Sequence, residues 1–272
     1  MTNQKPGERN LDGRDDAERS QPSPWASGGA DEFTTDWSAS DGGPGAANER
    51  SEPLINLAPA VMFFLVLMAS IHAVRSFVLP AGLDRAVLYW FAFIPEIAAY
   101  GVFGLLHELW AAITYSLLHG SWTHFFMNAV WLTIFGSPLA LRIGTTSFVL
   151  FWIVTAFAAA ALHFAIDPFS ASILVGASGS ISGMMGAAAR LGFRIDRRGA
   201  QRAFAGHPMT MSEVLRSRAV VAFISVWLLL NLMTGLFLPV GDSAIAWQAH
   251  IGGFIAGFFI LPFFPVQSGG HF

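Results

Sequence analysis

Residues 173–189 read ILVGASGSISGMMGAAA, and they hold the main evidence for how this chain folds. Apart from Ser178, Ser180 and Ser182, every side chain in this run is apolar or absent. Small residues let membrane helices pack closely, and glycine allows tight backbone turns. The run therefore predicts a short helix over about 177–193, with a serine at its start and a small face for packing.

The bulk composition is that of an integral membrane protein. The chain has 272 residues, of which 54% are hydrophobic and only 12% are charged, and its mean hydropathy is +0.53. Soluble domains carry about 25% charged residues. The chain has no cysteine, which excludes a disulfide framework, a thiolate metal site and a thiol nucleophile.

The N-terminal part differs from the rest of the chain. Residues 1–52 hold 11 of the 18 acidic residues, together with many Gly, Ser and Pro, and show no periodic apolar pattern. Such a composition cannot bury enough apolar surface to fold. We therefore predict a disordered acidic cytoplasmic tail over 1–52, a membrane domain over 53–265 and a short C-terminal tail over 266–272.

Six stretches are apolar enough for membrane helices, which need about 20 mostly apolar residues to span. Five are clear and the one at the Gly/Ser run is shorter; they lie at about 54–74, 123–140, 146–166, 177–193, 219–239 and 246–265. The stretch 86–106 is also apolar but carries Pro95 and Glu96 at its centre. A central carboxylate costs roughly 2.5–3.5 kcal/mol on insertion scales. We predict a loop lying partly in the interface there, with a seventh span as the alternative.

Basic residues set the predicted orientation. Seven of the 15 lie between positions 190 and 218, and basic loops stay in the cytoplasm. The fourth helix then runs from outside to inside, and six spans place both termini in the cytoplasm. A seventh span would move only the N-terminal tail to the other side. We expect a multi-pass integral protein of a bacterial inner membrane.

Four polar side chains within these spans are candidates for function, because such groups are costly inside a membrane. His124 and Asn128 lie in the first turns of the second helix, at i and i+4 on one face. Ser178 begins the fourth helix, and His250 lies in the first turns of the sixth. These three helices run in the same predicted direction, so the four side chains share one depth in the outer half of the bilayer.

Glycine spacing predicts that Ser178 and His250 meet. Gly253 and Gly257 follow His250 on one face of the sixth helix, and the fourth helix carries a small face of its own. Contact between these faces would bring the serine near the histidine. Taken singly, Ser178 could be a packing serine and the other polar residues could be interhelical hydrogen-bonding partners; their common depth favours a functional site.

These residues resemble the motifs of the rhomboid intramembrane serine proteases, over roughly 53–265. The motifs H-x4-H-x3-N, G-x-S-G and A-H-x-x-G-x-x-x-G are carried here by His119, His124, Asn128, Gly176, Ala177, Ser178, Gly179, Ala249, His250, Gly253 and Gly257. The resemblance implies an all-α integral membrane fold, a six-transmembrane-helix bundle with a membrane-inserted loop between helices 1 and 2. It implies a Ser178–His250 catalytic dyad and a gate at the fifth helix. His124 and Asn128, with the Ser178 backbone N–H, would form the oxyanion hole.

The chain departs from the family pattern at three positions. Ala111 and Ala140 stand where the family has Arg and often Glu, and Ser182 stands where it often has an aromatic residue packed on the catalytic histidine. The last departure leaves open what orients the histidine ring. Two further polar residues, His119 and Asn231, are interpreted as structural.

The predicted chemistry is peptide hydrolysis by a serine-type endopeptidase. A serine hydroxyl needs a base to take its proton, and histidine suits that role near neutral pH. Asp167 and Asp242 lie in loops, and no acidic residue is placed to orient His250, so we predict a dyad rather than a triad. The expected partners are transmembrane protein substrates in the lipid bilayer, cut within or beside their spans.

Two other functions compete with this prediction. The first is a catalytically inactive rhomboid-like protein that binds membrane clients, although Ser178, His250 and Asn128 are all present. The second is a small transporter, although the chain shows no internal repeat and no membrane-embedded acidic pair. We expect no metal, no cofactor and no nucleic-acid partner.

Overall fold

The computed structural model describes residues 57–196, 202–237 and 246–266. Apart from two isolated bridges, these residues are helical or irregular. The predicted tail over 1–52 lies outside the described residues, as does nearly all of the predicted C-terminal tail over 266–272. The described residues thus belong almost entirely to the predicted membrane domain.

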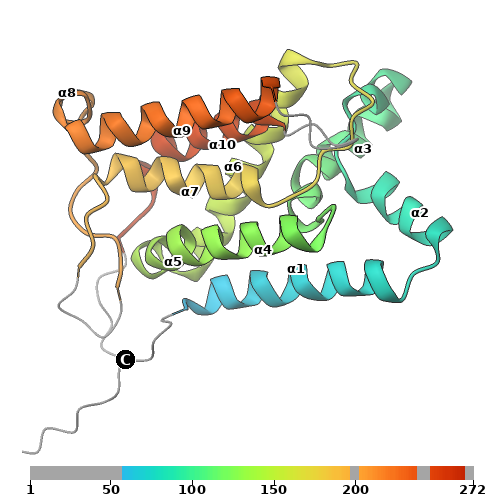
Figure 1. The fold of residues 1–272 in the computed structure, drawn as a ribbon, viewed down its shortest axis with the longest axis horizontal. Helices are drawn as coiled ribbons and strands as arrows, with labels where there is room; N and C mark the ends of the chain where they lie inside the picture. Colours follow the sequence, from blue (N-terminus) through green and yellow to red (C-terminus); the bar gives the residue numbers. More distant parts are fainter. Residues whose placement is uncertain (1–56, 197–201, 238–245, 267–272) are drawn as a thin grey trace, which may run out of the picture. The chain divides into compact units, whose positions relative to one another are not determined.

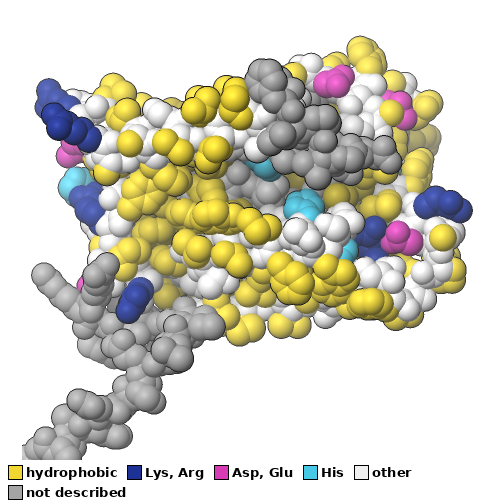
Figure 2. All heavy atoms as spheres, in the orientation of Figure 1, with side chains coloured by type: hydrophobic (Ala, Val, Ile, Leu, Met, Phe, Trp, Pro, Cys, Tyr) yellow, Lys and Arg dark blue, Asp and Glu magenta, His cyan; other side chains and the backbone are white. Residues whose placement is uncertain are grey.

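Four helical runs are long and apolar enough to cross a membrane: α1 (Pro59–Phe77), α4 to α5 (Trp122–Ile143), α6 (Thr145–Ile166) and α9 (Arg218–Phe237, apolar to Gly235). Their outward faces carry exposed Phe, Leu, Val and Met side chains, as expected of surfaces that face lipid. Figure 2 shows apolar side chains along the length of the helices and charged side chains gathered at the two ends. The chain is therefore a multi-pass membrane protein of the all-helical kind.

The second of these runs is continuous although it changes its pitch. α4 (Trp122–Trp131) passes through a π turn, η3 (Leu132–Gly136), into α5 (Ser137–Ile143). Pro138 is the second residue after the π turn, and its missing N–H removes one bond of the α-helical ladder. A wider turn of this kind keeps the helix unbroken where a regular α-helix would lose a bond.

The segment between α1 and α4 is broken into short pieces. It comprises α2 (Ala81–Phe91), a 3-10 turn η1 (Pro95–Tyr100), α3 (Val102–Thr114) and a second 3-10 turn η2 (Tyr115–Leu117). The stretch 86–106 is therefore no continuous helix. The buried Glu108 carboxylate accepts the Ile94 N–H at 2.9 Å and lies 3.0 Å from His107 Nδ1. That carboxylate fastens α3 to the short non-helical segment between α2 and η1.

Two short helices complete the bundle, and Figure 1 shows one of them, α7 (Ser178–Arg190), running between the α4–α5 run on one side and α9 on the other. α7 packs on α6 and on α10 (Trp247–Ile260), which ends in the 3-10 turn η4 (Leu261–Phe263). A Cβ added to Gly253 would fall on the carbonyl oxygen of Gly179, and one on Gly257 would fall on that of Gly183. The predicted contact between the small faces of the fourth and sixth helices is thus confirmed. The sixth helix is shorter than the predicted 246–265.

One end of the bundle is organised by arginine side chains. The buried Arg142 guanidinium, at the end of α5, donates to the carbonyl oxygens of Phe204 (3.0 Å) and Gly206 (2.7 Å). This ties the turn after α5 to the basic segment between α7 and α9. Arg142 therefore lies at the same end of the bundle as the basic residues that set the predicted orientation.

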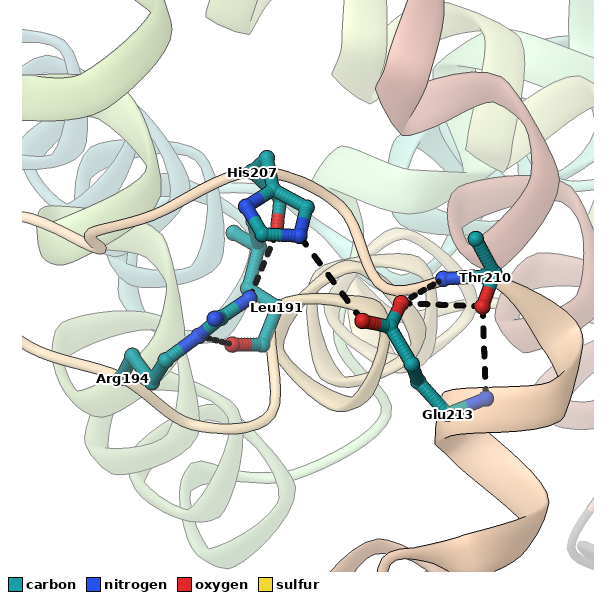
Figure 3. Close-up of polar contacts among 5 residues, drawn as sticks. All are labelled: Leu191, Arg194, His207, Thr210 and Glu213. Atoms are coloured by element: carbon teal, nitrogen blue, oxygen red, sulfur yellow. Dashed lines mark hydrogen bonds and ion pairs between the residues drawn. The ribbon is translucent and has the colours of Figure 1, made fainter.

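A polar cluster beside that segment starts α8 (Met211–Arg216), as Figure 3 shows. The Thr210 backbone N–H and hydroxyl donate to the Glu213 carboxylate at 2.6 and 2.9 Å, and the Glu213 N–H donates back to the Thr210 hydroxyl at 3.3 Å. This reciprocal pair is a capping box. The two donors from Thr210 lower the pKa of the Glu213 carboxyl. Arg194 in turn donates to the His207 carbonyl oxygen.

Candidate active site

Ser178 and His250 meet inside the bundle. The Ser178 Oγ, on the first residue of α7, lies 2.8 Å from the His250 Nε2 in the first turn of α10. The glycine contacts described above hold these two helices at backbone distance, which is close enough for two short side chains to touch. The pair has the geometry that a nucleophile and its base require.

α7, which begins at Ser178, is a short helix. It has 13 residues, and at 1.5 Å per residue it is roughly 20 Å long. Its last residue, Arg190, accepts the Met209 N–H through its carbonyl oxygen, so this end of α7 lies beside the basic segment before α8. Because the hydrocarbon core of a bilayer is about 30 Å thick, α7 is too short to cross it alone.

Gly176 shapes the approach to the serine. Its φ is +121°, a conformation that residues with a side chain rarely adopt. A Cβ at this position would lie 2.6 Å from Cε1 and 2.8 Å from Nε2 of His124. The Gly176 N–H donates to the Tyr115 carbonyl oxygen at 3.0 Å, which holds the segment in place. The imidazole of His124 therefore packs against the backbone two residues before Ser178.

Asn128 is the predicted site residue that the structure leaves apart. It is buried, and its amide nitrogen donates to the His124 carbonyl oxygen at 2.9 Å, one turn earlier in α4. Within the described part of the chain its side chain makes no hydrogen bond to Ser178 or His250. An amide NH₂ carries two donors, so one donor of Asn128 is not used by this bond.

The ring of His119 packs against that of His124. Its ring centroid is 5.2 Å from that of His124 and 6.4 Å from that of His72. The His119 carbonyl oxygen accepts a hydrogen bond from Arg75 at 2.9 Å, and Arg75 also pairs with Asp84 at 2.7 Å. These contacts, made by the His119 backbone, join α1, α2 and the turn before α4, while the two ring nitrogens of His119 have no hydrogen-bond partner among the described residues.

The three serines of the opening stretch have different surroundings. The Ser180 hydroxyl donates to the Trp152 carbonyl oxygen of α6 at 3.1 Å, as expected of a packing residue. Ser182 is buried, and its side chain makes no hydrogen bond to a described residue. Among these three, Ser178 has the hydroxyl that meets a histidine.

Asn231, interpreted from the sequence as structural, lies in contact with His250. It lies in α9, and its Oδ1 is 2.7 Å from the His250 Nδ1, so both ring nitrogens of His250 are engaged. The amide side chain of Asn231 in an apolar helix was itself an indication of a functional role, since polar groups in membrane spans are functional candidates by default. What the sequence lacked was any indication that this part of α9 faces the start of α10.

The site has no arrangement of metal ligands. Within the described ranges, no group of three or more His, Cys, Asp or Glu side chains is placed to hold a metal ion. Its polar groups are a hydroxyl, imidazoles, amides and the unpaired backbone N–H groups at the start of α7. Such a set suits acyl transfer by a serine nucleophile.

Comparison with known families identifies the family of the chain. The model of the rhomboid domain matches residues 106–265, which is more than half of the chain. The chain belongs to the rhomboid family. The matched residues contain α4, α7 and α10, the three helices that carry the sequence-predicted site of this rhomboid.

Individual relatives are more distant. This rhomboid is 26% identical over 188 residues to "Rhomboid protease GlpG" of Serratia proteamaculans, covering 69% of the chain and 57% of the relative. It is 27% identical over 174 residues to the protein of the same name from Yersinia pestis, covering 64% and 52%. It is 32% identical over 168 residues to "RHOMBOID-like protein 6, mitochondrial" of Arabidopsis thaliana, covering 60% and 47%. The chain spans about half the length of the curated relatives it matches.

Proposed function

We propose that this protein is an intramembrane serine endopeptidase that cleaves transmembrane or juxtamembrane segments of membrane proteins. The observation that carries the proposal is the 2.8 Å contact between Ser178 Oγ and His250 Nε2 inside a bundle of apolar helices. Membership of the rhomboid family and likeness to relatives named as rhomboid proteases support it. The proposed catalytic residues are Ser178 as nucleophile and His250 as base.

The proposed reaction follows from these two atoms. His250 Nε2 accepts the Ser178 hydroxyl proton as Oγ attacks the substrate carbonyl carbon. The protonated imidazole then gives that proton to the leaving amine, which leaves an acyl group on Oγ. A water molecule, deprotonated by the same nitrogen, then attacks the acyl carbon. His250 gives that proton to Ser178 Oγ as the acyl–oxygen bond breaks, which releases the acid product and restores the free enzyme. Each step uses His250 in one protonation state and returns it in the other.

The negative oxygen of the tetrahedral intermediate needs donors nearby. Ile181 is the first residue of α7 with an N–H bonded along the helix, at 3.0 Å to the Ala177 oxygen. The N–H groups before it, including that of Ser178, point out of the helix start, where the helix dipole favours negative charge. We assign His124, Asn128 and the Ser178 N–H to the oxyanion hole. One such donor is commonly worth about 2.7–4 kcal/mol.

The proposed topology has six spans, with the short helices α7 and α10 completing the four long ones. The segment of η1 and α3 is the proposed membrane-inserted loop. The arginines near α8 are assigned to the cytoplasm, with both termini on that side and a bacterial inner membrane as the location. The site then opens toward the extracytoplasmic face, and the proposed substrates have segments that unwind easily there.

The test is labelling by a fluorophosphonate probe, joined to cleavage of a transmembrane substrate, in purified protein. Ser178→Ala and His250→Ala are expected to abolish both, whereas Ser182→Ala, a buried serine in the same helix, keeps both. Substrates with helix-destabilising residues at the cut should be cleaved faster than helical ones. A folded wild type that neither labels nor cleaves would instead identify an inactive rhomboid-like protein that binds membrane clients.

A further inference from the structure

Both nitrogens of the His250 ring have partners, and the two partners come from different helices. Nε2 faces the Ser178 hydroxyl from α7 at 2.8 Å, and Nδ1 faces the Asn231 Oδ1 from α9 at 2.7 Å. An amide oxygen can only accept a hydrogen bond. Nδ1 must therefore carry the proton in this contact, and the neutral ring then has its lone pair on Nε2. That is the form a base needs in order to take the serine proton.

The amide of Asn231 is itself held in one orientation. Its nitrogen donates to the Trp227 carbonyl oxygen at 2.8 Å, one turn earlier in α9. Turning the amide over would place two oxygens against each other at Trp227, and it would aim the NH₂ group at the ring. The backbone of α9 thus selects the amide face that accepts from His250.

The contact between Asn231 and His250 is the middle one of three contacts between the antiparallel helices α9 and α10. One turn earlier in α9 and one turn later in α10, the rings of Trp227 and Phe254 stack at 4.4 Å between centroids and 24° between planes. One turn the other way, a Cβ on Gly235 would fall on the side chain of Trp247. Residues four apart lie on one helix face, so these contacts fix the register that places Asn231 on His250.

In the part of the chain that the structure describes, no group other than Asn231 makes a hydrogen bond with the Nδ1 of His250. Among the described residues, no acidic side chain lies in hydrogen-bond contact with His250, and Ser182, one turn below the nucleophile, makes no side-chain hydrogen bond. The ring of His124 packs against Gly176, two residues before Ser178. The orientation that an aromatic residue at position 182 would supply must come from elsewhere.

We propose that Asn231 is the positioning residue of the site: it holds the Nδ1–H form of His250 and aims Nε2 at the Ser178 hydroxyl. The inference rests on the proposed function, because orienting a base matters only if His250 acts as one. Asn231 takes the place of the acidic member of a catalytic triad but brings no charge, which suits a site surrounded by lipid. Because it belongs to α9, the active form of His250 depends on the register of that helix.

The test compares three variants of the full chain in detergent. Asn231→Leu removes the acceptor at similar size, and Asn231→Asp keeps an oxygen acceptor. Thr234→Val is the matched control, because its hydroxyl bonds only to the Leu230 and Asn231 carbonyl oxygens of α9. The readouts are kcat and KM for a transmembrane substrate, and ¹⁵N signals of the histidine ring, with those of His250 identified by their loss in His250→Ala.

Asn231→Leu should lower kcat on the order of 10- to 100-fold with little change in KM, and His250 should lose its predominant Nδ1–H form. Asn231→Asp should recover most of the rate, and Thr234→Val should match the wild type. An Asn231→Leu enzyme with normal kcat and an unchanged ring form would overturn the proposal. So would equal losses in all three variants, which would indicate a purely structural role.

The ring signals keep this test separate from that of the proposed function. If the wild type neither labels nor cleaves, the proteolytic function fails, while the ¹⁵N spectrum still reports which nitrogen carries the proton. A predominant Nδ1–H in the wild type that is lost in Asn231→Leu supports the positioning contact. A wild-type ring protonated on Nε2 overturns it whatever the activity.

Discussion

α7 and α9 both pack on α10, and they do so in opposite ways. In α7 every residue from Gly179 to Ala189 is buried, and its glycines bring backbone against backbone. In α9 only Val220 is buried among the side chains that the structure describes, and the contact with α10 is made by side chains. The same histidine is thus held from one side by a rigid interface and from the other by a sparse one.

The difference separates two tasks: fixing the distance between Ser178 and His250, and setting the orientation of His250. Backbone contact at glycine leaves no side chain that could shift. Close-packed interiors also have low compressibility, so this contact is rigid. It fixes the distance between Ser178 and His250. The contact between α9 and α10 relies on the side chains of Asn231, Trp227 and Trp247, and α9 is exposed over much of its surface. A local change in α9 can therefore alter the orientation of His250 without breaking the α7–α10 pair.

The largest expected effect is on the rigid side. Gly257→Leu would drive a side chain into the Gly183 carbonyl oxygen, and neither backbone can move away without parting the helices. We expect the free energy of unfolding in detergent to fall by about 3 kcal/mol, with loss of labelling at Ser178. The control is Gly82→Leu, because a Cβ at that glycine meets nothing within 4 Å. A stable, active Gly257→Leu protein would show that α7 and α10 are not in contact here.

A smaller effect is expected on the sparse side. Trp227→Ala removes the ring stacked on Phe254 and should cost about 1–2 kcal/mol of stability. Because the neighbouring Asn231 contact loosens, kcat should fall on the order of 3- to 10-fold. Leu229→Ala, which truncates an exposed side chain of the same helix, should change neither quantity. If Trp227→Ala and Leu229→Ala lose the same activity, then activity depends on the side-chain volume of α9 and not on the register of this helix against α10.

The smallest effect concerns the start of α8, outside the membrane helices. The pKa of Glu213 is lowered in the folded protein, chiefly by the Thr210 N–H. Because this pKa is lowered, the carboxylate stabilises the capping box fully at any pH above the ordinary carboxyl pKa of about 4.5. This stabilisation is lost as the pH falls through the pKa of the folded state. Amide exchange of α8, corrected for its intrinsic rate, should show protection falling in acid.

Glu213→Gln is the control for this last prediction, since its side chain does not titrate. Its α8 protection should be lower at neutral pH and flat across the acidic range, while cleavage stays at the wild-type rate. Acid-dependent protection that persists in Glu213→Gln would assign the effect to another group. A large loss of activity would mean that α8 controls α9, and the two sides of α10 would then be less separate than the packing indicates.

Much of the helical pattern could be predicted from the chain. The stretch predicted at 146–166 is α6 at Thr145–Ile166, and that at 123–140 is the run from α4 to α5. Apolar side chains fill a span of fixed length in a bilayer, so the ends of such helices follow from composition. The π turn before Pro138 was not predicted, because it changes the local hydrogen bonding without changing hydropathy.

The sequence by itself determined which helices carry Ser178 and His250 and how closely those helices could approach, since small residues permit contact at backbone distance. The tertiary structure decided what orients His250. α9 is apolar around most of its surface, so its composition prefers no face, and the position of Asn231 follows from contacts with α10 that lie far apart in the chain. Hydropathy fixes that a helix crosses the membrane, whereas its rotation and register are set by the partner against which it packs.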